Sequence, residues 1–150
     1  MDSILTSIYQ EDQIFIKNIS FKENLSLEAI CLVPLESHYT SLPISYVTTE
    51  NYVRCLSQSS YLLGYYIIRN KLINIKLSEE DFLKAAKGLD IYYRNLSMTF
   101  HKRVMKGSEF KMALELKNFR EVHSLKDFIL FTFSSPRTVI SGEMSFVIVE

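Results

Sequence analysis

One long segment, residues 49–69, limits what this chain can fold into. Its sequence, TENYVRCLSQSSYLLGYYIIR, has no strict alternation of apolar and polar residues, and it is too long for a single strand. Thr48 or Thr49 can cap a helix, Glu50 suits the positive first turn, and apolar residues then recur three to four positions apart. The pattern predicts a helix over 49–69. Because the second half is apolar on nearly every side, other elements have to enclose this helix.

The segments on both sides of this helix have the patterns of strands. Two runs precede it, at 13–20 and 25–35, and four follow it, at 89–104, 109–122, 127–135 and 138–150. A shorter helix is predicted before these four runs, with Ser78 as its N-cap and Gly88 as its C-terminal stop. The order β-β-α-α-β-β-β-β with short turns indicates an antiparallel sheet. We predict one α+β domain, residues 1–150, in which a concave sheet face covers the long helix.

Composition argues against several classes of protein. Seventeen basic and seventeen acidic side chains give a net charge of zero, which argues against a nucleic-acid partner and favours self-association. No segment approaches the roughly 18 apolar residues of a membrane span, and the first residues lack the basic stretch of a signal peptide. We therefore expect a cytoplasmic protein in which Cys31 and Cys55 are small buried hydrophobes.

Polar residues occur in the long helix and in the loop before it, where packing alone requires none. The loop at 36–46 carries His38 and Tyr39, and the helix carries Ser57 and Gln58 among apolar neighbours. A histidine titrates near neutral pH and can act as a general base or orient a water molecule. A tyrosine hydroxyl can donate to a carbonyl oxygen. A buried glutamine needs partners, so Gln58 is expected either to tie down the loop or to bind substrate.

Motifs for other kinds of site are missing from the sequence. No G-x-S-x-G elbow surrounds Ser57, no glycine-rich nucleotide loop is present, and neither His101 nor His123 has the neighbours of a metal ligand. We expect no cofactor and no metal. Four basic residues could meet the phosphates of a pantetheine carrier, although a solvated strand face is the more ordinary reading: Arg94, Lys102, Arg103 and Lys106.

The loop and helix motifs resemble those of known families. Glu36-Ser37-His38-Tyr39 and Cys55-Leu56-Ser57-Gln58-Ser59-Ser60-Tyr61 resemble the E-S-x-Y and C-x-x-Q-x-x-Y motifs of the FcoT-like family. Its members are hot-dog proteins described as long-chain fatty-acyl thioesterases, with relatives assigned as (2E)-enoyl-carrier-protein glycyltransferases. Residues 38–44 also resemble the corresponding loop of hot-dog 3-hydroxyacyl-carrier-protein dehydratases. The resemblance implies a hot-dog fold, an antiparallel sheet wrapped around a long central helix.

The sequence departs from these families at three positions. Arg54 stands where the dehydratases have an acidic residue, so a His–carboxylate pair for hydration or dehydration lacks its second proton-transfer group. Thr48 and Ser57 stand where the FcoT-like pattern has asparagines. Both can form hydrogen bonds, but the chemistry that asparagine would supply does not transfer directly.

The resemblance implies a hydrolase of fatty acyl thioesters, carried on coenzyme A or on an acyl carrier protein with its phosphopantetheine arm. Because hot-dog sites usually form between two subunits, a homodimer or larger homo-oligomer is expected. The expected catalytic residues are His38, Tyr39 and Ser57. The expected substrate-binding residues are Thr48, Thr49, Arg54, Gln58 and Tyr61. Tyr9 resembles an N-terminal tyrosine of the family pattern, although core packing is favoured for it.

Other functions stay open at this point. A glycyltransferase would add an amine to an enoyl thioester and would need a cation for the glycine carboxylate, for which Arg54 or Arg94 is the candidate. A dehydratase-like enzyme is a further alternative. A hot-dog module that binds acyl chains without turning them over is the non-enzymatic alternative.

Overall fold

The computed structural model describes residues 2–37, 40–122 and 128–149. Within this described part, six strands form one antiparallel sheet in the order β1-β2-β4-β5-β6-β3. The strands are β1 (Ile16–Lys22), β2 (Ser26–Leu32), β3 (Ile91–Phe100), β4 (Glu109–Val122), β5 (Phe128–Ser135) and β6 (Ile140–Val149). The helices are α1 (Asp2–Ile8), α2 (Thr49–Arg69) and α3 (Glu79–Gly88), with a short 3-10 turn at Glu11–Gln13. The α+β class and the antiparallel sheet are as predicted.

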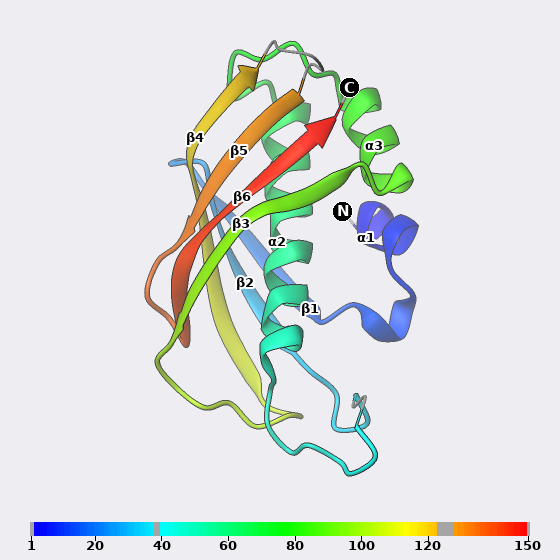
Figure 1. The fold of residues 1–150 in the computed structure, drawn as a ribbon, viewed down its shortest axis with the longest axis vertical. Helices are drawn as coiled ribbons and strands as arrows, with labels where there is room; N and C mark the ends of the chain where they lie inside the picture. The colour runs from blue at the N-terminus through cyan, green and yellow to red at the C-terminus, as the bar shows by residue number, and fades with distance from the viewer. Residues whose placement is uncertain (1, 38–39, 123–127, 150) are drawn as a thin grey trace.

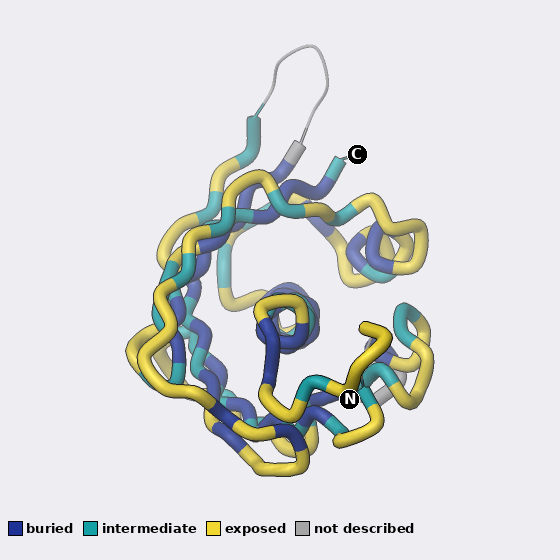
Figure 2. The backbone as a smooth tube through the Cα atoms, turned by 60° about the horizontal axis from the view of Figure 1, so that its bottom comes forward, coloured by how far each residue is buried: buried dark blue, intermediate teal, exposed yellow. Residues whose placement is uncertain are grey.

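The long helix α2 lies on the concave side of the sheet. It begins at Thr49 and ends at Arg69, the bounds that the sequence predicts. The sheet curves around α2, and α1 and α3 lie on the side that the sheet leaves open (Figures 1 and 2). Most of the second half of α2 is buried, including Leu63 and Ile67, neither of which has any exposed surface. The surrounding elements therefore enclose the apolar half of α2, as its sequence requires.

Buried and less buried residues alternate along the strands, and the buried ones form the inner face of the sheet. In β2 every second residue is buried, and Leu27 and Cys31 have no exposed surface. Leu27 pairs with Leu114 of β4, and Cys31 pairs with Phe110. Because side chains alternate between the two faces of a strand, this register places four apolar residues on the face toward α2. The two buried cysteines, Cys31 and Cys55, are free thiols, as expected.

Four segments differ from the sequence prediction, and one of them is the strand expected over 25–35, which ends at Leu32. The helix α1 was not predicted, because seven residues are too few for a clear period, and its stability depends on burying Ile4 and Leu5. The first strand begins at Ile16 rather than at residue 13, since the 3-10 turn precedes it. The strand β3 ends at Phe100 rather than at residue 104. Beyond it the chain turns to the loop before α2, where the Val47 amide donates to the Val104 carbonyl over 2.9 Å.

None of the helices in the described ranges combines the length and the apolar character needed to cross a membrane.

Candidate functional site

Four hydroxyl-bearing residues meet beside the middle of α2, and we call them the hydroxyl cluster: Tyr9, Ser57, Tyr61 and Tyr93. Ser57 lies on α2 near the hydroxyls of Tyr9 and Tyr93, and hydrogen bonding from Ser57 lowers the pKa of both tyrosines. The rings of Tyr9 and Tyr61 meet edge to face with their centroids 6.3 Å apart. The cluster thus joins the segment after α1, the face of α2 that carries Ser57, and strand β3 of the sheet.

Tyr93 reaches the cluster because β3 is irregular at this point. The pairing register between β3 and β6 shifts between Tyr93 and Asn95. Such a bulge changes the direction of a side chain without ending the strand. The Tyr93 ring packs on Phe146 at 4.4 Å between centroids, and its hydroxyl donates to the Val53 carbonyl over 3.3 Å. Tyr93 is therefore held from both the sheet and the helix.

Burial raises the pKa of the tyrosines of the hydroxyl cluster. It raises the pKa of Tyr61 to about 12, and the neighbouring Tyr9 adds to the effect. Burial also raises the pKa of Tyr9 and of Tyr93, while the hydrogen bonds with Ser57 act in the opposite direction. The positive charge of Arg54 further opposes the rise at Tyr9.

The hydroxyls of Tyr61 and Tyr93 already donate to the backbone carbonyls of Ile91 and Val53. A protonated hydroxyl such as that of Tyr9 can stabilise negative charge on a carbonyl oxygen.

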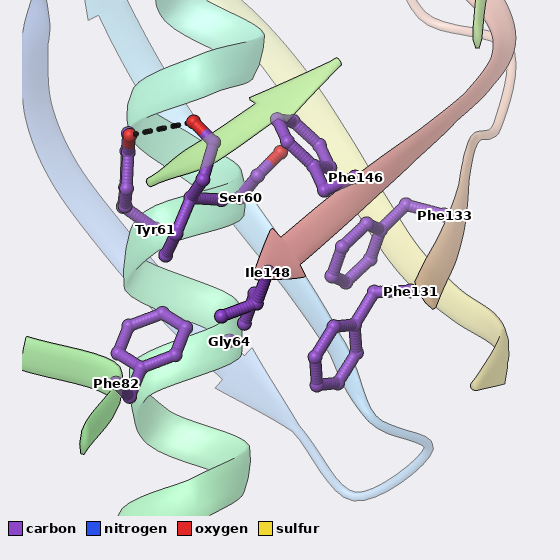
Figure 3. Close-up of a pocket in the computed structure, with 9 residues that line it drawn as sticks. Ser60, Tyr61, Gly64, Phe82, Phe131, Phe133, Phe146 and Ile148 are labelled. Atoms are coloured by element: carbon purple, nitrogen blue, oxygen red, sulfur yellow. Dashed lines mark hydrogen bonds between the residues drawn. The ribbon is translucent and has the colours of Figure 1, made fainter. Parts of the chain in front are cut away.

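A small apolar cavity lies beside α2 at Ser60, Tyr61 and Gly64 (Figure 3). Its volume is about 20 Å³, room for about one water molecule. It is lined by Ser60, Tyr61 and Gly64 of α2, Phe82 of α3, Ile91 of β3, Phe131 and Phe133 of β5, and Phe146 and Ile148 of β6. Tyr61 belongs to both the cluster and the cavity wall.

The polar groups on the cavity wall are already engaged. The Ser60 hydroxyl donates to the Leu56 carbonyl over 2.7 Å within the helix. The Tyr61 hydroxyl points to the Ile91 carbonyl, 3.5 Å away (Figure 3). What remains around this small space is aromatic and aliphatic surface.

Gln58 ties down a different segment from the one expected. Its side-chain oxygen accepts from the Phe15 amide at 3.0 Å, and its nitrogen donates to the Gln13 carbonyl over 2.7 Å. Gln58 therefore anchors the segment that leads into β1, not the loop at 36–46, and its side chain is fully buried.

Arg54 holds the same segment. Its guanidinium lies over the Phe15 ring, 5.2 Å from the centroid, and donates to the side-chain oxygen of Gln13. We expected Arg54 to bind substrate directly. In the structure its bonds are intramolecular, and what it brings to the cluster is positive charge beside Tyr9.

Thr48 and Thr49 lie at the first turn of α2, apart from the hydroxyl cluster. The Thr48 hydroxyl and amide both contact the side-chain oxygen of Asn51 at 3.0 Å, which closes the helix start. Both threonines line a shallow groove with His101 and Lys102. Nine residues separate Thr48 from Ser57, about 13 Å along a helix axis. The predicted site residues thus divide between two places on α2.

Two further predicted site residues, His38 and Tyr39, belong to the loop before α2 and lie outside the described residues. Around them, the loop is held by Lys106, whose amide donates to the Ser45 carbonyl over 2.9 Å and whose ammonium donates to the Ser37 carbonyl. Lys106 is only 4% exposed. It is neither a solvated strand residue nor an available phosphate ligand, and its role in the structure is to anchor this loop. Arg94 remains exposed on β3.

Sequence reasoning missed Tyr93 and left Tyr9 to core packing. Tyr93 was visible only as one aromatic residue within the strand-like run IYYRNLSM, and alternation there does not reveal a bulge. Tyr9 lies 48 positions before Ser57, so only the packing of α1 on α2 brings them together. The phenylalanines that line the cavity alternate along their strands, as they do in any buried strand. Core packing alone produces this pattern, so the sequence does not reveal a cavity.

A comparison with protein-family models and a search of curated proteins both found no match to this chain.

Proposed function

We propose that this protein is a hot-dog acyl-thioester hydrolase that acts on fatty acyl groups carried by coenzyme A or an acyl carrier protein. The observation that carries the proposal is the hydroxyl cluster beside α2, which gathers three tyrosines and Ser57. A thioester carbonyl oxygen gains negative charge during attack, and hydroxyl donors can stabilise that charge. The curved antiparallel sheet around α2 and the motifs around Ser57 are compatible with the hot-dog fold and the FcoT-like family.

The proposed reaction is attack by water on the thioester carbonyl. A carbon–oxygen bond forms and the carbon–sulfur bond breaks, so that the acyl group leaves as a free acid and the carrier as a thiol. Tyr9 and Ser57 donate to the carbonyl oxygen, and Tyr93 holds Ser57 in place. His38 orients or deprotonates the water, and Tyr39 contributes a further donor. The engaged side chain of Arg54 makes it a poor site for a glycine carboxylate, which leaves the exposed Arg94 as the candidate that glycine transfer would need.

The test is mass spectrometry of the purified protein incubated with saturated and 2-enoyl thioesters, with and without glycine. We expect free acid without glycine, and a Ser57→Ala variant should lower kcat about 100-fold, as loss of one oxyanion donor does. Ser20→Ala, on the exposed part of β1, is the matched control and should retain full turnover.

Other outcomes of this experiment would replace the proposal. A glycine adduct formed only on 2-enoyl substrates would identify a glycyltransferase. Bound acyl chains without any turnover would identify a binding module.

We also propose that the protein forms a homodimer through β3. This strand is at the edge of the sheet, and in the described part of the chain no strand pairs with its outer side. Tyr92 and Phe100 are exposed on it, at 53% and 47%. A long unpaired edge with exposed aromatic residues is a ready template for pairing with a second copy.

A further inference from the structure

We propose that the groove at the start of α2 is a binding site for a phosphate group. The groove has a volume of about 520 Å³ and is lined by the loop and first helical residues at 44–50, by Tyr52, and by the segment at 100–103. It lies apart from the hydroxyl cluster, so this inference is independent of the proposed hydrolysis. Three features of the groove point to an anion: the helix start, a buried hydroxyl without a partner, and a run of basic residues.

The first feature is the N-terminus of α2. The amides in the first turn of a helix have no partner within the helix, and the aligned peptide dipoles place partial positive charge there. Thr48 is the N-cap, and the Asn51 side chain accepts from its amide at 3.0 Å. The next amide, that of Thr49, has no hydrogen-bond partner among the residues that the structure describes. Because Thr48 and Thr49 both line the groove, this positive helix end faces an anion bound there.

The second feature is the hydroxyl of Tyr52, one turn into α2. Tyr52 is 3% exposed and lines the groove, and no group in the described part of the chain hydrogen-bonds with its hydroxyl oxygen. Its ring packs against Phe100, another residue of the groove wall, with the two centroids 5.5 Å apart. A buried hydroxyl without a partner costs free energy, and a bound ion or water molecule is an ordinary remedy. A phosphate oxygen in the groove supplies the acceptor that this hydroxyl lacks.

The third feature is the positive charge of the segment after β3. Three consecutive residues of this segment line the groove: His101, Lys102 and Arg103. The Arg103 guanidinium lies over the Tyr46 ring, 4.5 Å from its centroid, and the Nε2 atom of His101 is 2.6 Å from the Ser141 hydroxyl oxygen. Among the described residues, neither Lys102 nor Arg103 has a carboxylate within ion-pair distance. Both cations are therefore available to an anion, and a guanidinium can bind phosphate through two hydrogen bonds.

One acidic residue of the groove wall, Glu50, acts against an anion. Two permanent cations and the helix end outweigh its single negative charge. The two other basic residues considered as phosphate ligands do not line this groove, since Lys106 is bound to the loop before α2 and Arg94 lies within β3. Free phosphate and the phosphate groups of coenzyme A share the chemistry that the groove recognises, and the experiment separates these two sources.

The experiment is calorimetric titration of the full chain at low salt with inorganic phosphate, with coenzyme A and with pantetheine, which carries no phosphate. Lys102→Gln and Arg103→Gln should each weaken phosphate binding about tenfold, the effect of losing one charged hydrogen bond. Glu50→Gln should strengthen it, because a repulsive charge is removed. Lys87→Gln on α3 and Arg120→Gln on β4 remove the same charges from exposed positions outside the groove and should leave the dissociation constant unchanged.

Tyr52→Phe tests the buried hydroxyl separately from the charges. It should weaken phosphate binding about fivefold. It should not lower the thermal stability of the free protein, since the hydroxyl that it removes has no partner in the described part of the chain. Phosphate binding as tight as that of the wild type would show that this hydroxyl does not belong to the site.

Weaker phosphate binding in the groove variants, with both controls unchanged, supports the inference. Coenzyme A that binds more tightly than phosphate, and loses affinity in the same variants, identifies the thioester carrier as the source of the group. Coenzyme A that binds no better than pantetheine, while phosphate binds, identifies free phosphate. A wild-type protein that binds neither phosphate nor coenzyme A, or an equal loss of affinity in the controls, overturns the inference.

Discussion

Among individual residues, Gln58 and Arg54 show how polar side chains on α2 organise the site without contacting a substrate. Both reach the segment before β1, Gln58 through its two hydrogen bonds with Gln13 and Phe15, and Arg54 through Gln13 and the Phe15 ring. That segment follows directly on Tyr9. By holding it against α2, the two residues set the distance between the Tyr9 hydroxyl and Ser57.

Loss of the Gln58 side chain should therefore destabilise the fold. In Gln58→Ala the Phe15 amide and the Gln13 carbonyl lose their partners in a buried place, and each unsatisfied group costs about 1–3 kcal/mol. We expect the free energy of unfolding to fall by about 2–4 kcal/mol, measured by urea denaturation. Gln10→Ala, an exposed glutamine just before this segment, should change it by no more than about 0.5 kcal/mol. Equal stability of the two variants would contradict the anchoring role.

At the scale of elements, β3 depends on β6, and Gly142 sets how closely the two strands approach. Gly142 pairs with Met98, and a Cβ atom on it would lie 2.0 Å from the Ser97 carbonyl oxygen. That neighbour is backbone and cannot rotate away. Since Tyr93 reaches the hydroxyl cluster from β3, any displacement of this strand also moves a donor of the site.

Gly142→Ala should force β3 away from β6. We expect a loss of about 3 kcal/mol or more in the free energy of unfolding, the upper range for overpacking, because the strand rather than a side chain has to move. Thermal and urea denaturation measure the loss. Glu143→Ala, at the exposed neighbouring position, is the control and should be nearly neutral. A Gly142→Ala protein with wild-type stability would show that the strands are not held at this spacing.

At the scale of the molecule, the sheet has two edges, β1 and β3, and the two are unlike. β3 has ten residues against seven in β1, and it carries two exposed aromatic side chains, Tyr92 and Phe100. It also carries Tyr93, one of the four residues of the hydroxyl cluster. Pairing of β3 with a second copy would therefore place the sites of both subunits beside the interface.

We expect sedimentation velocity to give twice the mass of one chain. Replacing Tyr92 and Phe100 together by aspartate should shift the protein toward the monomer, because like charges facing one another across paired strands are unfavourable. Leu72→Asp, which charges an equally exposed apolar residue away from β3, should leave the mass unchanged. A wild-type protein that sediments as a monomer at all concentrations tested would rule out the dimer.

The sequence alone determined the elements whose patterns are local: the bounds of α2, the alternating strands, the antiparallel sheet and the burial of both cysteines. It also pointed to Ser57 and Tyr61 as residues of interest. Only the tertiary structure decided what these residues meet. A periodic pattern tells which face of an element is buried but not which side chain packs on it.

The partners of the site come from distant parts of the chain. Gln58 binds a backbone amide 43 positions away, and Tyr93 reaches Val53 across 40 positions, with a bulge that has no sequence signature. Such contacts form because several elements are packed at once, so the hydroxyl cluster and the close approach of Phe82 to Gly64 are properties of the packed fold rather than of any single segment.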